Sequence, residues 1–227
     1  MSRKNGLFFI AGIFAALVAA GFARQKNRRS VVPNLRLWGR ALQRQHGRQQ
    51  AQQITELVQQ RYEQLMRAQP RYENRRLQLQ LAGVILPGLA LYQGLKEHHE
   101  NQQELLVEME KYLGMPFSLP MKVIPLFRFL PSPFAFFRRA FGSRMRDFPA
   151  EGWDIDWLED GGKAVAFNIS RCFYLDVLTR LGAPELTPAF CSTDELLASA
   201  FPPSIRFVRC GTLARGDPCC DFRYERT

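Results

Sequence analysis

Cysteine thiols are the side chains of this sequence best suited to nucleophilic chemistry, and all of them lie in its last quarter. They are Cys172, Cys191, Cys210, Cys219 and Cys220. An odd number of cysteines without a CxxC pair is not typical of a secreted disulfide framework. The three histidines lie far upstream, so neither a Ser-His-Asp set nor a zinc-ligand spacing is present in this region. We therefore predict no metal and no other cofactor.

Cys191 stands just before a pattern that begins helices. Ser192 is followed three residues later by Glu195, which matches the capping box Ser-x-x-Glu. With Ser192 as N-cap, Cys191 precedes a helix N-terminus, where the helix dipole favours a thiolate. Two interpretations stay open, a nucleophile or a small apolar residue packed against Leu196. Asp194, in the first turn, is likewise either an acid/base group or a surface carboxylate that the dipole stabilises.

Cys172 is the leading candidate nucleophile. It follows Ser170 and is expected in the first turn of a helix, where the dipole again favours the thiolate. The alternative is a buried residue that packs beneath the sheet. Cys220 alternates with Phe222 and Tyr224, which places it on the apolar face of a strand and favours a role in the core.

Two arginines and an aspartate are the candidate substrate-binding residues. Arg209 and Arg223 fall on adjacent predicted strands, where they can hold a substrate carboxylate bidentately, although such residues are more often at the surface. Asp221 shares a strand face with Arg223, so it either joins this site or forms an Asp–Arg pair. Gly216 and Asp217 are expected to form the hairpin turn, since Gly permits positive φ and Asp favours turns.

Two hairpins must position these side chains. Trp153, Ile155 and Trp157 alternate with aspartates, as in a half-buried strand, and a Gly-Gly turn leads to a returning strand. The same logic predicts a second hairpin near the C-terminus and two helices between the hairpins. Together they predict an α+β fold, an antiparallel sheet with helices on one face. The predicted strands are 153–157, 164–169, 205–210 and 219–225, and the predicted helices are 172–181 and 193–200.

Residues 51–149 are predicted to be helical. Apolar residues from Ile54 to Met66 recur every three or four positions and predict an amphipathic helix that ends near Pro70. A second helix is expected over 76–100, kinked at Pro87, and helical character continues to Leu113.

Residues 115–149 combine many phenylalanines with prolines and arginines. Three interpretations are open for this segment. Its aromatic side chains either cap the core, lie at a membrane interface where aromatic and basic residues sit together, or line a pocket.

The N-terminal segment from Leu7 to Ala23 carries no charge. A transmembrane anchor, a cleaved signal peptide and a buried helix are the competing interpretations. Positive charges just after the segment outnumber those before it, which favours an uncleaved anchor whose downstream side is cytoplasmic. We therefore predict a single-pass membrane protein, with an anchor over 1–23, a basic juxtamembrane stretch over 24–50 and a cytoplasmic body over 51–227.

The net charge of +10 belongs to the N-terminal region. Ten Lys and Arg residues precede Glu56, the first acidic residue, and the remaining basic residues are matched by all 21 acidic ones. A body without net positive charge is not typical of a nucleic-acid-binding protein. We predict the membrane as a partner, through the N-terminal helix, and no nucleic-acid partner.

Three stretches resemble a known family. They read ILPGLALYQGLKE at 85–97, RCFYLDVLTRLGAPELTPAFCSTD at 171–194 and IRFVRCGTLARGDPCCDFRYER at 205–226. In order and spacing they are similar to the L-2-amino-thiazoline-4-carboxylic acid hydrolase family, over roughly 50–226. The C-terminal part is also similar to 4-vinyl reductase-type (TRAPP-like) ligand-binding domains. The N-terminal anchor, Cys210 and Cys219 depart from the family's pattern.

The resemblance implies a hydrolase that opens a C–N bond of a small cyclic amidine or amide carrying a carboxylate. Such a reaction needs a nucleophile, an acid/base group and a cation for the carboxylate. The resemblance supports Cys172, Cys191 and Asp194 as catalytic candidates, and a small-molecule substrate as the partner. The alternative is a non-catalytic small-molecule or lipid-binding module of the same fold at the membrane.

Overall fold

The computed structural model describes residues 32–227, so the predicted membrane anchor lies outside the described residues. Val32–Thr227 form one folded unit. Within this part of the chain, none of the helices combines the length and the apolar character needed to cross a bilayer.

The long helix α2, Leu35–Ala68, confirms the predicted apolar stripe, since Ile54, Val58 and Tyr62 are buried. It begins earlier than expected and bends at Gly47, whose φ of 79° lies outside the helical region. Residues 35–50, expected in the basic juxtamembrane stretch, form its first half. Trp38 in this half is buried and donates a hydrogen bond from Nε1 to the carbonyl of Tyr112, 2.9 Å away.

The predicted kink at Pro87 takes the form of a π-helical turn. Helix α3, Arg75–Gln80, continues through the turn η1, Leu81–Ile85, into helix α4, Leu86–Lys96. Proline has no amide hydrogen, and its ring crowds the carbonyl four residues earlier, so a regular α-helix is disfavoured here. The Leu86 amide instead donates to the Leu81 carbonyl, five residues earlier, so this turn of the helix contains one residue more than an α-helical turn.

A buried carboxylate joins the first helices. Glu108 lies on helix α5, Gln102–Gly114, and is 4% exposed. Its carboxylate oxygens lie 3.3 Å from His46 Nε2 and 2.8 Å from His99 Nε2. Since a buried carboxylate is costly without such partners, this contact ties α5 to the bend of α2 and to the segment after α4.

The phenylalanine-rich segment forms helix α6, Ser118–Val123, and helix α7, Pro133–Arg146, joined by a 3-10 turn over Ile124–Phe129. On α7, Phe137 and Phe141 pack against Tyr224 of the sheet, with ring centroids 4.8 and 4.7 Å away. These aromatic side chains therefore cap the core, which is one of the three interpretations. The α6 part of the segment behaves differently and is described below.

The four strands are β1, Trp153–Asp160, β2, Ala164–Cys172, β3, Ile205–Val208, and β4, Cys220–Arg226. They form one antiparallel sheet in the order β1-β2-β4-β3, with both predicted hairpins present. Helix α8, Phe173–Arg180, and helix α9, Thr187–Ala198, lie between the hairpins in the chain. The predicted α+β fold is confirmed.

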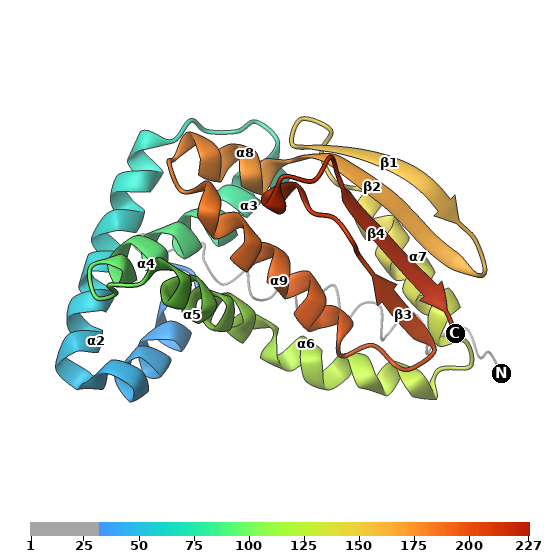
Figure 1. Ribbon diagram of the computed structural model, residues 1–227, viewed down its shortest axis with the longest axis horizontal. Helices are drawn as coiled ribbons and strands as arrows, with labels where there is room; N and C mark the ends of the chain where they lie inside the picture. The colour runs from blue at the N-terminus through green and yellow to red at the C-terminus, as the bar shows by residue number, and fades with distance from the viewer. Residues whose placement is uncertain (1–31) are drawn as a thin grey trace. The chain divides into compact units, whose positions relative to one another are not determined.

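The two faces of the sheet differ in character. One face carries Phe167, Phe222 and Tyr224, and the rings of α7 pack against it. The other face carries an ion-pair network in which Arg223 binds Glu159 and Glu225. Figure 1 shows α9 passing between α5 and the β3–β4 pair, so this helix joins the helical half to the sheet.

We expect Gly88→Val to lower the free energy of unfolding by about 1–3 kcal/mol, because the contact that brings α4 against α9 leaves no room for a side chain. A Cβ at Gly88 would lie 2.5 Å from Phe190 Cζ and 3.1 Å from Leu113 Cδ2. Urea unfolding measures the loss. Gly162→Val is the matched control, since a Cβ there meets nothing within 4 Å. Equal losses from the two variants would contradict this account of the packing.

Candidate functional site

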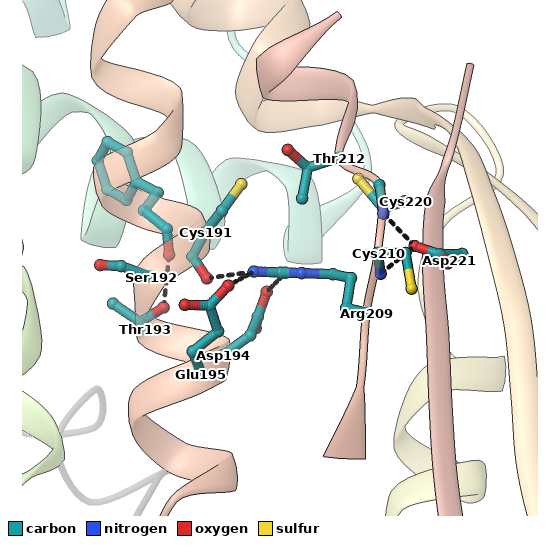
Figure 2. Close-up of polar contacts among 12 residues, drawn as sticks. Cys191, Ser192, Thr193, Asp194, Glu195, Arg209, Cys210, Thr212, Cys220 and Asp221 are labelled. Atoms are coloured by element: carbon teal, nitrogen blue, oxygen red, sulfur yellow. Dashed lines mark hydrogen bonds and ion pairs between the residues drawn. The ribbon is translucent and has the colours of Figure 1, made fainter. Parts of the chain in front are cut away.

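Arg209 lies at the centre of the candidate site, directly after β3. Its side chain is 3% exposed, and its guanidinium carbon lies 5.2 Å from the Phe222 ring centroid and 5.8 Å from that of Phe207. Stacking on these rings covers the flat faces of the guanidinium but leaves its N–H groups free to bond in its plane. Figure 2 shows the guanidinium directed from the end of β3 towards α9.

Three acceptors on α9 receive these N–H groups. Nη1 donates to Asp194 Oδ2 at 2.9 Å, and Nη2 donates to Glu195 Oε1 at 2.8 Å. Nη2 also donates to the carbonyl oxygen of Cys191 at 3.2 Å. Two carboxylates and a carbonyl thus compensate one buried cation (Figure 2), and they fix α9 against the sheet.

The predicted helix start at Ser192 is wrong, because α9 begins at Thr187. Pro188, in the first turn, has a backbone φ that suits a helix start, so the helix begins six residues before the predicted 193. The Ser192 hydroxyl donates to the carbonyl of Ala189 instead of capping the helix. Cys191 is therefore an interior helix residue. Both interpretations of Cys191, a thiolate favoured by the helix dipole and a small apolar residue packed against Leu196, required a position just before the helix, which it does not have.

The thiols are kept neutral by burial. Desolvation raises the pKa of Cys191 to about 12 and that of Cys172 to about 11. Cys172 ends β2 and is the N-cap of α8, and the amides of Tyr174 and Leu175 do lower its pKa, as the sequence predicted. Burial outweighs them, so the predicted stabilisation of a thiolate is not achieved at either cysteine.

Asp194 is the group of this cluster that titrates nearest to neutral pH. Desolvation raises its pKa to about 6, and the negative charge of Glu195 adds to the rise, while Arg209 opposes it. Solvent still reaches the side chain of Asp194, which is 43% exposed. A carboxyl with such a pKa can both take and return a proton at neutral pH.

The loop that carries Arg209 is held by two aspartates of the family-like C-terminal stretch. Asp221 Oδ1 accepts hydrogen bonds from the amides of Cys210 and Gly211, at 2.9 and 2.6 Å (Figure 2). Asp217 Oδ2 accepts one from the Thr212 amide at 2.7 Å, beside Gly216, whose φ is 89°. The predicted turn role of Gly216 and Asp217 is confirmed. Asp221 holds backbone amides, in place of the Asp–Arg pair that was the alternative.

The sheet separates Arg223 from Arg209. Arg223 pairs with Val208 in the β3–β4 register, so Arg209, the next residue, points to the opposite face. Arg223 lies in the exposed network with Glu159 and Glu225. The two arginines therefore do not converge on one carboxylate. Cys220 is buried on the apolar face, as predicted.

Three contributors to the site were not predicted. Glu195 entered the sequence argument only as part of a capping box, and Phe207 and Phe222 only as strand residues. The alternation of Phe207 with Arg209 was the available signal, since it places both side chains on one face. In residues 32–227, groups of three or more His, Cys, Asp or Glu side chains placed to hold a metal ion are absent.

A family model matches the part of the chain that contains the site. The family model of L-2-amino-thiazoline-4-carboxylic acid hydrolase matches residues 121–224, which confirms the resemblance over that range. The match contains the whole Arg209 cluster and most of the sheet. No curated protein matches the chain.

We expect iodoacetamide to alkylate Cys210 in the folded protein much faster than Cys172 and Cys191. Cys210 is exposed, whereas the other two residues are half-buried and the pKa values of their thiols are raised. Mass spectrometry of proteolytic peptides after timed labelling at neutral pH measures the order. A Cys210→Ser variant should lose the fast adduct. Fast labelling of Cys172 or Cys191 in that variant would instead reveal an activated thiolate.

The raised pKa of Asp194 predicts how stability changes with pH. The folded chain keeps this proton up to about pH 6, whereas an unfolded Asp loses it near pH 4. The stabilisation is thus present below about pH 4 and is lost as the pH rises through about 6. Between about pH 4 and pH 6, we expect the free energy of unfolding of the natural chain to fall relative to that of Asp194→Asn. Above about pH 6 the difference between the two should be constant. Urea titrations at a series of pH values measure it, and a constant difference throughout would contradict the raised pKa.

Proposed function

We propose that this protein is a hydrolase of the L-2-amino-thiazoline-4-carboxylic acid hydrolase kind, because the model of that family matches residues 121–224. Its substrate is a small cyclic amidine or amide with a carboxylate, and the bond that opens is a C–N bond. The observation that carries the proposal is the contact between buried Arg209 and Asp194, whose pKa is about 6, inside the matched segment.

Asp194 is proposed as the general base and acid. Its carboxylate takes a proton from a water molecule whose oxygen bonds to the amidine carbon, and returns it to the ring nitrogen as the C=N bond becomes a single bond. The carboxylate then takes the proton of the new hydroxyl group as the C=O bond forms, and returns it to the same nitrogen as the C–N bond breaks. A single carboxyl with a pKa near neutral suffices for all of these transfers.

Arg209 is proposed to bind the substrate carboxylate. Its guanidinium already holds two carboxylates, which shows that its geometry suits this group. Glu195 is the replaceable partner, because its side chain is 56% exposed and can turn into solvent. A substrate carboxylate in its place would lie beside Asp194.

Water is favoured over a cysteine as the nucleophile. The pKa values of Cys172 and Cys191 are raised to about 11 and 12, so both thiols are protonated at neutral pH.

Attachment to a membrane is proposed from the sequence. The uncharged segment from Leu7 to Ala23 and the positive charges that follow it support a single-pass anchor with a cytoplasmic body. The anchor would hold the hydrolase at the membrane surface without taking part in the reaction.

The test is turnover of L-2-amino-thiazoline-4-carboxylate, followed by mass spectrometry. We expect Asp194→Asn to lower kcat/KM by about 100-fold or more, and the natural chain's kcat/KM to rise with pH through about 6. Arg209→Lys should raise KM by about 10-fold, since lysine cannot bind a carboxylate bidentately. Cys172→Ala and Cys191→Ala should stay within a few-fold of the natural chain, and circular dichroism checks that each variant is folded.

Other outcomes would redirect the proposal. Loss of turnover in a folded cysteine variant would restore the thiol as nucleophile. No turnover from the folded natural chain would favour a non-catalytic binding module. That alternative has one observation in its favour, because the chain's own groups already occupy the N–H edge of Arg209.

A further inference from the structure

A second surface of the body combines exposed apolar side chains with positive charge. It is formed by α6 and the 3-10 turn after it, residues 118–129, and is called the α6 surface here. Leu119, Leu126 and Phe129 are 48%, 56% and 70% exposed. They are half of the six large apolar side chains that are exposed in residues 32–227. Figure 1 shows α6 beyond the end of α5, at the margin of the helical half.

Prolines explain why these side chains stay exposed. Residues 115–129 form elements of three to six residues, and five prolines lie within or beside them. The 3-10 turn buries Ile124 and Phe127, whereas α6 and the turn before it bury none of their residues. A longer amphipathic helix would turn one continuous apolar face inward, which the prolines prevent. The prolines are Pro116, Pro120, Pro125, Pro131 and Pro133.

The surroundings of the α6 surface are positive. Residues 111–146 contain seven Lys and Arg and no acidic residue, although the chain after residue 55 is neutral as a whole. Arg138 and Arg146 bind Asp160 of β1. Lys122 and Arg128 lie exposed among the apolar side chains. The guanidinium carbon of Arg128 is 4.6 Å from the Phe129 ring centroid, so cation and aromatic ring form one unit.

We propose that the α6 surface lies on an anionic phospholipid bilayer. Phe129, Leu126 and Leu119 enter the boundary between headgroups and acyl chains, and Lys122 and Arg128 contact the lipid phosphates. Exposed aromatic, aliphatic and basic side chains in a stretch of sequence without acidic residues match this boundary. Lys122 favours the bilayer over a protein partner, because lysine, unlike arginine and phenylalanine, is depleted from protein interfaces. The inference extends the membrane attachment proposed above and does not depend on catalysis.

This contact would bring the candidate site close to the membrane. Helix α5 leads into the α6 surface, and it packs along α9, which carries Asp194. The packing is close, because a Cβ on Gly114, the last residue of α5, would lie 2.8 Å from Leu196 Cδ2. The bilayer would therefore fix the orientation of the helix that carries the proposed acid/base group.

Fluorescence quenching by brominated lipid tests the proposal on the full chain. Vesicles contain equal parts of phosphatidylglycerol and phosphatidylcholine with brominated acyl chains, and an alkaline wash keeps only inserted protein. Phe129→Trp places a reporter in the α6 surface, and Leu158→Trp places one at a matched position, since Leu158 is 60% exposed on β1. The three natural tryptophans give the same background in both variants.

We expect the lipid to quench at least half of the fluorescence added at position 129 and little of that added at position 158. The N-terminal segment is the same in both variants, so an anchor alone cannot produce the difference. Adding Lys122→Glu and Arg128→Glu should abolish the difference, as should about 1 M salt, where the Debye length falls to about 3 Å. Phosphatidylcholine alone should give a weaker effect.

Equal quenching at the two positions, or none at either, would overturn the proposal. A difference that survives charge reversal would overturn the assignment to anionic lipid. If quenching is absent and Phe129→Glu converts a dimer to a monomer in analytical ultracentrifugation, the α6 surface instead binds a second copy of the chain. Turnover is measured on the same samples, so a failed hydrolase and a failed membrane surface are told apart. Protein lost in the alkaline wash would count against the anchor.

Discussion

The packing around the candidate site depends on the burial of one positive charge, that of Arg209. An arginine side chain that is 3% exposed is costly unless acceptors compensate its charge. Arg209 has two carboxylates and a carbonyl from α9 as acceptors, while the Phe222 ring supports it from the sheet. Arg209 therefore couples three elements: the loop after β3 that carries it, helix α9 that supplies its acceptors, and the apolar face of β4 against which it packs.

The same packing sets the chemistry of the groups around Arg209. Desolvation is the first cause of the raised pKa at Cys172, Cys191 and Asp194 alike. For the thiols it leaves a protonated, weakly nucleophilic group. For the carboxyl it moves the pKa into the range where acid/base catalysis at neutral pH is efficient. Burial thus favours the carboxylate over the cysteines as the reactive group.

Helices α2, α4 and α5 support this site from outside the segment that matches the family. Gly88 of α4 admits the ring of Phe190, the residue before Cys191, and α5 packs along α9. Glu108, with His46 and His99, joins α5 to the bent helix α2. The α6 surface follows the C-terminal end of α5, and its prolines keep apolar and basic side chains exposed there.

The sequence by itself determined the elements whose patterns are local. Alternation gave the strands and the buried face of Cys220, Gly216 and Asp217 marked the turn, and three motifs indicated the family. Only the tertiary structure decided the start of α9, the separation of Arg209 from Arg223 and the protonation of the thiols. A local pattern reports the backbone preference of a few residues. The partners and the burial of a side chain come from elements far apart in the chain, and these determine its pKa and its ion pairs.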